Sequence, residues 1–71
     1  MDFGKMLQDL KLEQKGRRKG WNAVQLGKPV YITMIYSQEL EPYFVFNDGE
    51  KERIWTPSTH DILADDWEVV E

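Results

Sequence analysis

The sequence predicts an α+β fold, a small antiparallel sheet with two short helices, from three observations. An amphipathic helical pattern opens the chain, and a helix-capping sequence precedes a second helix near residue 60. Segments rich in β-branched and aromatic residues, typical of strands, lie between and after these helices. Two of these segments flank an Asp-Gly turn and are expected to pair as a hairpin. With 71 residues, the chain is expected to form a single domain over residues 1–71.

The first helix is predicted to begin after Asp2, which is suited to cap it. Four apolar side chains follow with the i, i+3, i+4, i+7 spacing of one helix face: Phe3, Met6, Leu7 and Leu10. Gly16 is expected to end this helix just after Lys15. Residues 17–21 are compatible with either a strand or an extended loop.

Three strands are predicted in the middle of the chain. The first covers residues 30–36, which are mostly β-branched or aromatic. Polar residues and a proline predict a loop over residues 37–42. Residues 43–46 and 51–55 are expected to pair across a turn at residues 47–50, because Asp-Gly tolerates the positive φ that tight turns need.

The second helix has two possible starts. Thr56 can cap it with Pro57 at the first helical position, or Ser58 can cap it with Asp61 three residues later. Both arrangements place the helix after residue 55, directly behind the last strand of the hairpin.

The end of the chain is predicted to pack against the rest. Ile62 and Leu63 are expected to be buried, and the Asp65–Asp66 pair is expected to end the second helix. Residues 67–70 then form a short final strand, in which Trp67 is assigned to the core.

Oligomerisation is expected because a lone core of this size is marginally stable. A chain of about 60 residues buries only about 60% of the surface that its unfolded form exposes. Small domains often compensate with disulfides or a structural metal. The sequence has no Cys and one His, His60, which excludes a disulfide framework and a Cys/His zinc site. Association between subunits is the route that remains.

The charge excludes some partners. The net charge of −4 argues against binding to a nucleic-acid polymer. Residues 1–35 nevertheless carry seven basic and three acidic side chains, and residues 36–71 carry two basic and ten acidic. This asymmetry fits either a dipolar domain or a local anion site around residues 15–19. No apolar run approaches the about 20 residues of a membrane span, and no apolar signal region opens the chain, so a cytoplasmic protein without a membrane partner is expected.

Residues suited to catalysis are scarce, so the chain is not expected to be an enzyme. His60 and Asp61 are adjacent, but neighbouring residues on a helix do not face each other, which favours a solvated histidine. Ser58 is explained by helix capping. The Asp65–Asp66 pair lacks a third metal ligand, and no glycine-rich phosphate loop occurs. Neither a metal nor a cofactor is therefore expected.

Three tryptophans, Trp21, Trp55 and Trp67, are many for a domain of this size. Trp67 lies in an apolar segment, as a core residue would. Trp21 precedes Asn22, and Trp55 precedes Thr56, so these two rings have hydrogen-bonding neighbours. For both of them, packing in the core and lining a pocket are about equally good interpretations.

A nucleotide pocket needs flat rings, hydrogen-bonding groups and cations, and all three occur near these two rings. Asn22 offers a donor and an acceptor to a base or ribose edge. Arg18 and Arg53 carry forked donors that suit phosphate oxygens. The helix start at Ser58 presents backbone N–H groups that favour an anion.

Two segments carry a family resemblance. Residues 18–22 are Arg-Lys-Gly-Trp-Asn, and residues 55–70 begin Trp-Thr-Pro-Ser and end Trp-Glu-Val-Val. With the opening Phe3-Gly4 and its short helix, they resemble the small phage Thoeris anti-defence proteins of the second type over nearly the whole chain. After the first segment, this family often continues Gly-Lys where this chain has Ala23-Val24.

The resemblance implies a sponge that binds glycocyclic ADP-ribose, the signal of a bacterial TIR-domain immune enzyme, and withholds it without degrading it. It also implies homotetramers with ligand pockets between protomers. Some members are implicated in sequestering the cyclic dinucleotides of CBASS immunity at separate sites. Residue chemistry and resemblance together select nine candidate ligand-binding residues: Phe3, Arg18, Trp21, Asn22, Arg53, Trp55, Thr56, Ser58 and Asp61.

Two other functions fit the sequence less well. An acidic protein-interaction module would use the acidic half of the chain, residues 39–71, to inhibit a host enzyme by direct contact. A small hydrolase would use His60 and Asp61, and it is the least favoured of the three.

Overall fold

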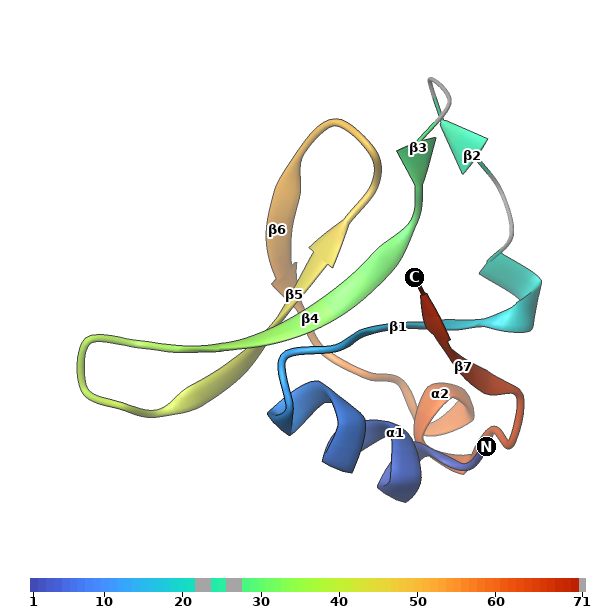
Figure 1. Ribbon diagram of the computed structural model, residues 1–71, viewed down its shortest axis with the longest axis horizontal. Coiled ribbons are helices and arrows are strands. Elements are labelled where there is room, and N and C mark those ends of the chain that lie inside the picture. The colour runs from blue at the N-terminus through green and yellow to red at the C-terminus, as the bar shows by residue number, and fades with distance from the viewer. Residues whose placement is uncertain (22–23, 26–27, 71) are drawn as a thin grey trace.

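The α+β fold is confirmed by a computed structural model, which describes residues 1–21, 24–25 and 28–70 (Figure 1). Two short helices lie together next to a curved antiparallel sheet. In chain order, the elements are α1 (Phe3–Lys11), β1 (Lys15–Arg18), the 3₁₀ turn η1 (Lys19–Trp21), β2 (Val24–Gln25), β3 (Lys28–Pro29), β4 (Tyr31–Tyr36), β5 (Pro42–Asn47), β6 (Glu52–Trp55), α2 (Thr59–Leu63) and β7 (Trp67–Val70).

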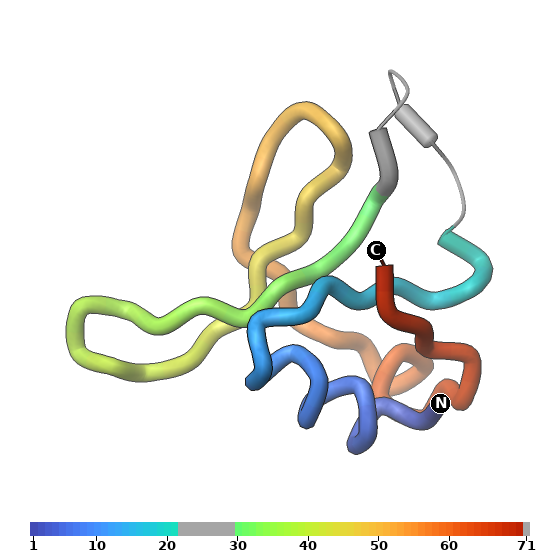
Figure 2. The backbone as a smooth tube through the Cα atoms, in the orientation of Figure 1, coloured from blue at the N-terminus to red at the C-terminus, as the bar shows by residue number. Residues whose placement is uncertain are grey.

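The main sheet of the described residues has five strands in the order β6-β5-β4-β1-β7, and β2 pairs with β3 beside it. Strands β4 and β5 pair over six positions, from Tyr31 opposite Asn47 to Tyr36 opposite Pro42. By contrast, β1 meets β4 only where Gly16 lies opposite Ile32. The far end of the β4–β5 hairpin therefore extends away from the helices, as the backbone trace shows (Figure 2).

The core lies between α1 and one face of this sheet. Its fully buried side chains are Met6 and Leu10 from α1, Ile32 from β4 and Trp67 from β7. The burial of Trp67, with 1% of its surface exposed, confirms its assignment to the core. Three further rings, those of Phe44, Phe46 and Trp55, pack against these four buried side chains. Phe44 and Phe46 are alternate residues of β5, and Trp55 lies opposite Phe44 on β6, so the face of these strands that lies toward the core is largely aromatic.

Gly16 does not end α1, as the sequence predicted, but lies inside β1. The helix stops at Lys11, and Glu13 takes a φ of 66° that turns the chain back toward the sheet. A Cβ at Gly16 would lie 2.5 Å from Sδ of Met6. The glycine is therefore needed for the close approach of α1 to β1, a long-range requirement that resembles a helix-stop signal in the sequence.

The start of α2 uses the second of the two predicted caps. The Ser58 hydroxyl accepts a hydrogen bond from the Asp61 N–H, and the Asp61 carboxylate accepts one from the Ser58 N–H. This reciprocal capping box satisfies two backbone donors at the helix start. The helix ends at Leu63, before the acidic pair that was expected to end it.

The predicted burial of Ile62 and Leu63 is wrong. Their exposed fractions are 48% and 77%, because α2 has only five residues and turns this pair toward solvent. The neighbouring Ala64 is the residue that packs against the core. The helices of the described residues are too short and too polar to cross a membrane.

The predicted hairpin turn between β5 and β6 is confirmed. Gly49 takes a φ of 96°, and the carboxylate of Asp48 accepts hydrogen bonds from the backbone N–H groups of Glu50 and Lys51. These two hydrogen bonds hold the pKa of Asp48 below its ordinary value. The strands predicted at residues 30–36, 43–46, 51–55 and 67–70 occur as β4, β5, β6 and β7, with ends that shift by at most one residue. Strand β1 begins at Lys15, where the end of the helix was expected, and β2 and β3 were not predicted.

Candidate ligand-binding site

Six rings make edge-to-face or tilted contacts in a continuous group, called here the aromatic cluster: Phe3, Trp21, Phe44, Phe46, Trp55 and Trp67. Trp21 lies at its centre, with its ring centroid 5.3 Å from Trp67, 5.5 Å from Phe46 and 5.9 Å from Trp55. Trp21 and Trp55 are half-buried, in contrast to Trp67. Both rings therefore pack on the core and also present part of their surface outward.

A polar network joins the end of β1 to α2. Arg18 Nε donates to Asp66 Oδ1 at 2.9 Å, and Arg18 Nη1 donates to Asp61 Oδ1 at 3.2 Å. The other carboxylate oxygen of Asp61 accepts from the Ser58 hydroxyl at 2.9 Å. The backbone carbonyl of Asp61 accepts from the Trp67 indole N–H at 2.8 Å, which connects the network to the aromatic cluster.

The network favours the charged form of each of its ionisable groups. Hydrogen bonds to Asp66 and Asp61 raise the pKa of Arg18 above its ordinary value. Partial burial raises the pKa of Asp61, but hydrogen bonds from Ser58 and Arg18 outweigh this effect and lower it overall. The hydrogen bond from Arg18 lowers the pKa of Asp66. One guanidinium and two carboxylates give the network a charge of −1, which disfavours a phosphate at Arg18.

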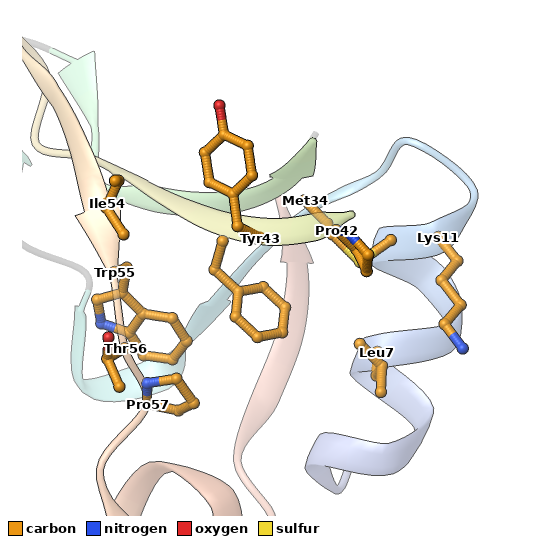
Figure 3. A pocket seen from close by; sticks show the side chains of 10 residues that line it. Leu7, Lys11, Met34, Pro42, Tyr43, Ile54, Trp55, Thr56 and Pro57 are labelled. Atoms are coloured by element: carbon orange, nitrogen blue, oxygen red, sulfur yellow. The ribbon is translucent and has the colours of Figure 1, made fainter. Parts of the chain in front are cut away.

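A groove of about 500 Å³ opens beside the aromatic cluster (Figure 3). Leu7 and Lys11 of α1 form one end, and Trp55, Thr56 and Pro57 form the other. Between them, the lining residues come from β4, β5 and β6: Met34, Pro42, Tyr43, Phe44 and Ile54. Most of this lining is apolar, and the Lys11 ammonium and the Thr56 hydroxyl are polar groups at its opposite ends.

Two of the nine candidate residues, Trp55 and Thr56, line the groove. Arg53 precedes them on β6, exposed at the surface, and its guanidinium carbon lies 5.0 Å from the centre of the Phe46 ring. It forms no ion pair with a carboxylate in the part of the chain that the structure describes. Arg53 is not part of the lining of the groove, but it offers a cation two residues before Trp55 on the same strand.

The other candidates occupy different positions. Arg18, Ser58 and Asp61 belong to the polar network. Phe3 packs in the aromatic cluster, 5.3 Å from Trp67 between ring centroids, and Trp21 lies at the centre of that cluster. Asn22, together with the adjacent Ala23, lies outside the described residues.

Lys11 and Leu7 were not singled out in the sequence as site residues. Leu7 was assigned to the core-facing stripe of the helix, but it lies at the margin of that stripe and lines the groove. Lys11, in the last turn of α1, carried no motif. The only available signal was helical periodicity, since residues 7 and 11 are one turn apart and share a face. No group of three His, Cys, Asp or Glu residues able to hold a metal occurs within the described ranges.

The structure is that of a small α+β domain with an open, mostly apolar groove. Comparison with known proteins identifies its family: residues 1–70 match the Thoeris anti-defense 2-like domain, and the chain belongs to this family. The protein named Thoeris anti-defense 2 from Bacillus phage SP01 is 32% identical over 88 aligned positions, which cover 99% of this chain and 94% of that protein. Family membership supports a role against bacterial defence.

Proposed function

We propose that the chain is a sponge that binds glycocyclic ADP-ribose in the groove and sequesters it without degrading it. It acts as a homotetramer in the cytoplasm of the infected bacterium and thereby inhibits Thoeris immunity. Separate sites take up cyclic dinucleotides of CBASS immunity. The observation that carries this proposal is the groove itself, in which a half-buried tryptophan ring and a hydroxyl group lie side by side.

The dimensions and chemistry of the groove suit a nucleotide. Its volume of about 500 Å³ falls within the range of about 300–1,000 Å³ that is typical of small-molecule sites. The exposed part of the Trp55 ring can stack on a base, and Thr56 can hydrogen-bond to a ribose hydroxyl. Arg53 shares a strand face with Trp55, about 6.6 Å along β6 at about 3.3 Å per residue. We assign the diphosphate to Arg53 rather than to Arg18, whose guanidinium already binds two carboxylates.

Binding without turnover is consistent with the lining of the groove. Catalysis of hydrolysis generally needs a positioned acid or base. The described residues that line the groove include neither a carboxylate nor an imidazole, the groups used most often, and their ionisable side chains are Lys11 and Tyr43. His60 lies on α2 in an exposed position and is not part of this lining.

The experiment incubates the purified protein with glycocyclic ADP-ribose, removes free ligand, denatures the protein by heat and analyses what is released. Recovery of the intact ligand is expected. A converted product would contradict the sponge and favour an enzyme. Absence of nucleotide binding, combined with co-purification of a host enzyme, would favour the protein-interaction module. The same protocol with cyclic dinucleotides tests the CBASS part of the proposal.

Two substitutions test the assigned contacts. Arg53→Gln removes the cation two residues before Trp55 and is expected to weaken binding by about 10-fold or more, since hydrogen bonds to charged groups contribute about 1.5–3 kcal/mol. Arg17→Gln is the matched control, because Arg17 also lies on a strand but pairs with Glu68 at 2.9 Å. Equal affinities for these two variants would contradict the role of Arg53. Thr56→Val preserves the shape of an exposed side chain and tests the hydroxyl group alone.

A further inference from the structure

The β4–β5 hairpin ends in an exposed tip, and we infer that this tip packs into the α1 end of the groove in a second copy of the chain. This tip, residues 36–41, is named the arm. The arm would close one end of the groove and leave Trp55 and Thr56 open to the ligand. This assembly therefore deepens the proposed function, since it rests on the same groove.

The arm carries apolar side chains that its own chain leaves uncovered. Leu40 is 80% exposed, and Tyr36 is 56% exposed. The hairpin extends away from both helices in the orientation shared by Figures 1 and 2. Exposed apolar side chains gathered on a projecting element are typical of a surface that binds another protein.

The backbone of the arm is held in a defined and strained conformation. The hydroxyl oxygen of Ser37 accepts hydrogen bonds from the N–H groups of Glu39 and Glu41, each at 3.2 Å. The Ser37 carbonyl accepts a further hydrogen bond from the Leu40 N–H at 2.9 Å. Leu40 has a φ of 62°, a left-handed conformation that is unfavourable for leucine. Such strain concentrates at functional positions, and here it accompanies an apolar side chain presented to solvent.

The groove complements the arm in both polarity and charge. Near α1 its walls are Leu7, Met34 and Pro42, which suit a leucine side chain. Lys11 stands at this end and forms no ion pair among the residues described. Two carboxylates, those of Glu39 and Glu41, flank the leucine of the arm. The leucine of the arm would thus contact the apolar walls, and its two neighbouring glutamates would lie near the lysine.

The position of the groove points to a second copy as the occupant. Pro42 lines the groove and also begins β5, opposite Tyr36 at the base of the arm. The arm therefore starts at its own groove and leads away from it. Two copies related by a two-fold axis can each insert an arm into the groove of the other, the reciprocal contact that such symmetry produces.

Cysteine cross-linking tests the contact directly, because the chain has no Cys of its own. A Leu7→Cys chain is mixed with a Leu40→Cys chain under mild oxidation. A disulfide-linked dimer of the two chains is expected to form at least about ten times faster than in a control mixture of Leu7→Cys with Leu63→Cys, since Leu63 is 77% exposed but lies on α2 outside the groove. Equal rates in both mixtures would overturn the inference.

A charge exchange tests the same contact through the mass in solution, measured by analytical ultracentrifugation. Lys11→Glu is expected to weaken association at least 10-fold, and the further changes Glu39→Lys and Glu41→Lys are expected to restore it. Lys51→Glu, in the turn between β5 and β6, is the control for net charge. Circular dichroism confirms that each variant is folded. An unchanged mass for Lys11→Glu, or a failure of the triple variant to recover, would overturn the inference.

The two proposals fail in different ways. If the wild-type protein releases intact nucleotide while Lys11→Glu keeps its mass in solution, the sponge is supported and the arm contact is wrong. If Lys11→Glu dissociates and the triple variant recovers while no form of the protein binds nucleotide, the arm contact is supported and the sponge is wrong.

Discussion

Arg18 donates a hydrogen bond from Nη1 to the carboxylate of Asp61 at 3.2 Å, although the two residues are 43 positions apart in the chain. The same guanidinium binds Asp66 through Nε at 2.9 Å. These contacts fasten the start of α2 and the segment before β7 to the end of β1. Arg18 was a sequence candidate for binding a phosphate. In the structure, its contacts stabilise the segments that position the aromatic cluster and Thr56.

The fork geometry of Arg18 leads to the first prediction. Arg18→Lys keeps the charge, but a single ammonium group cannot hold two carboxylates in the same fixed arrangement. We expect a clear fall in Tm, measured by circular dichroism. Arg17→Lys is the control, because Arg17 binds one carboxylate, that of Glu68, and its Tm should fall less. Similar Tm values for the two variants would show that the fork has no special role.

Acid sensitivity provides the second prediction. The pKa values of Asp61 and Asp66 lie below their ordinary value of 3.8 in the folded protein. The unfolded chain therefore binds protons more readily than the folded protein. The free energy of unfolding that these two carboxylates contribute is fully present above about pH 4 and is lost as the pH falls through the lower, folded pKa values. Chemical denaturation between pH 6 and pH 2 measures the free energy of unfolding across this window.

The control for this pH dependence is a substitution in the same acidic segment. Asp66→Asn removes one of the two carboxylates and should make the loss of stability below pH 4 shallower. Asp65→Asn changes the net charge equally, but Asp65 is exposed and forms no ion pair within the described part of the chain. If both variants show the same slope, general charge repulsion, rather than the Arg18 network, governs the acid response.

Features that depend on a few neighbouring residues could be predicted from the sequence. The Ser58 capping box and the turn at Gly49 are examples, because each is determined by side chains within four positions of one another. The Arg18–Asp61 contact joins distant segments and left no local pattern. The exposure of Leu63 could not be predicted either, since it depends on how short α2 is and on the direction in which it leaves the sheet. For the groove, helical periodicity grouped Leu7 with the core, and only the packing of α1 on β1 shows which side chains lie at the margin.

The close approach of α1 to β1 gives the third prediction. A Cβ at residue 16 would lie 2.5 Å from Sδ and 3.2 Å from Cγ of Met6, whose side chain is fully buried. Gly16→Ala should therefore destabilise the fold by about 1–3 kcal/mol, the usual cost of overpacking a core. For a domain of this size, each kcal/mol lowers Tm by about 4–8 °C.

Gly20→Ala is the matched control for this prediction. A Cβ there meets no atom within 4 Å, so the substitution should leave Tm unchanged or raise it slightly. The double variant Gly16→Ala with Met6→Ala should lose less stability than the sum of its single changes, because the shorter side chain makes room for the new methyl group. Additive losses would show that the glycine is required for some other reason.

The indole N–H of Trp67 separates the structural from the binding role of the tryptophans. Trp67→Phe leaves the Asp61 carbonyl without its partner at 2.8 Å, which should cost about 1–3 kcal/mol, and the smaller ring leaves a cavity in the core. Trp55→Phe makes the same change in a half-buried ring whose indole N–H donates no hydrogen bond to the described residues. We therefore expect thermal denaturation to show a large fall in Tm for Trp67→Phe and a small one for Trp55→Phe.

Calorimetry with glycocyclic ADP-ribose should show the reverse order for affinity, since a phenyl ring stacks on a base over a smaller area. If Trp67→Phe weakened binding more than Trp55→Phe at a temperature where both are folded, the groove would be the wrong site and the ligand would lie nearer the Arg18 network.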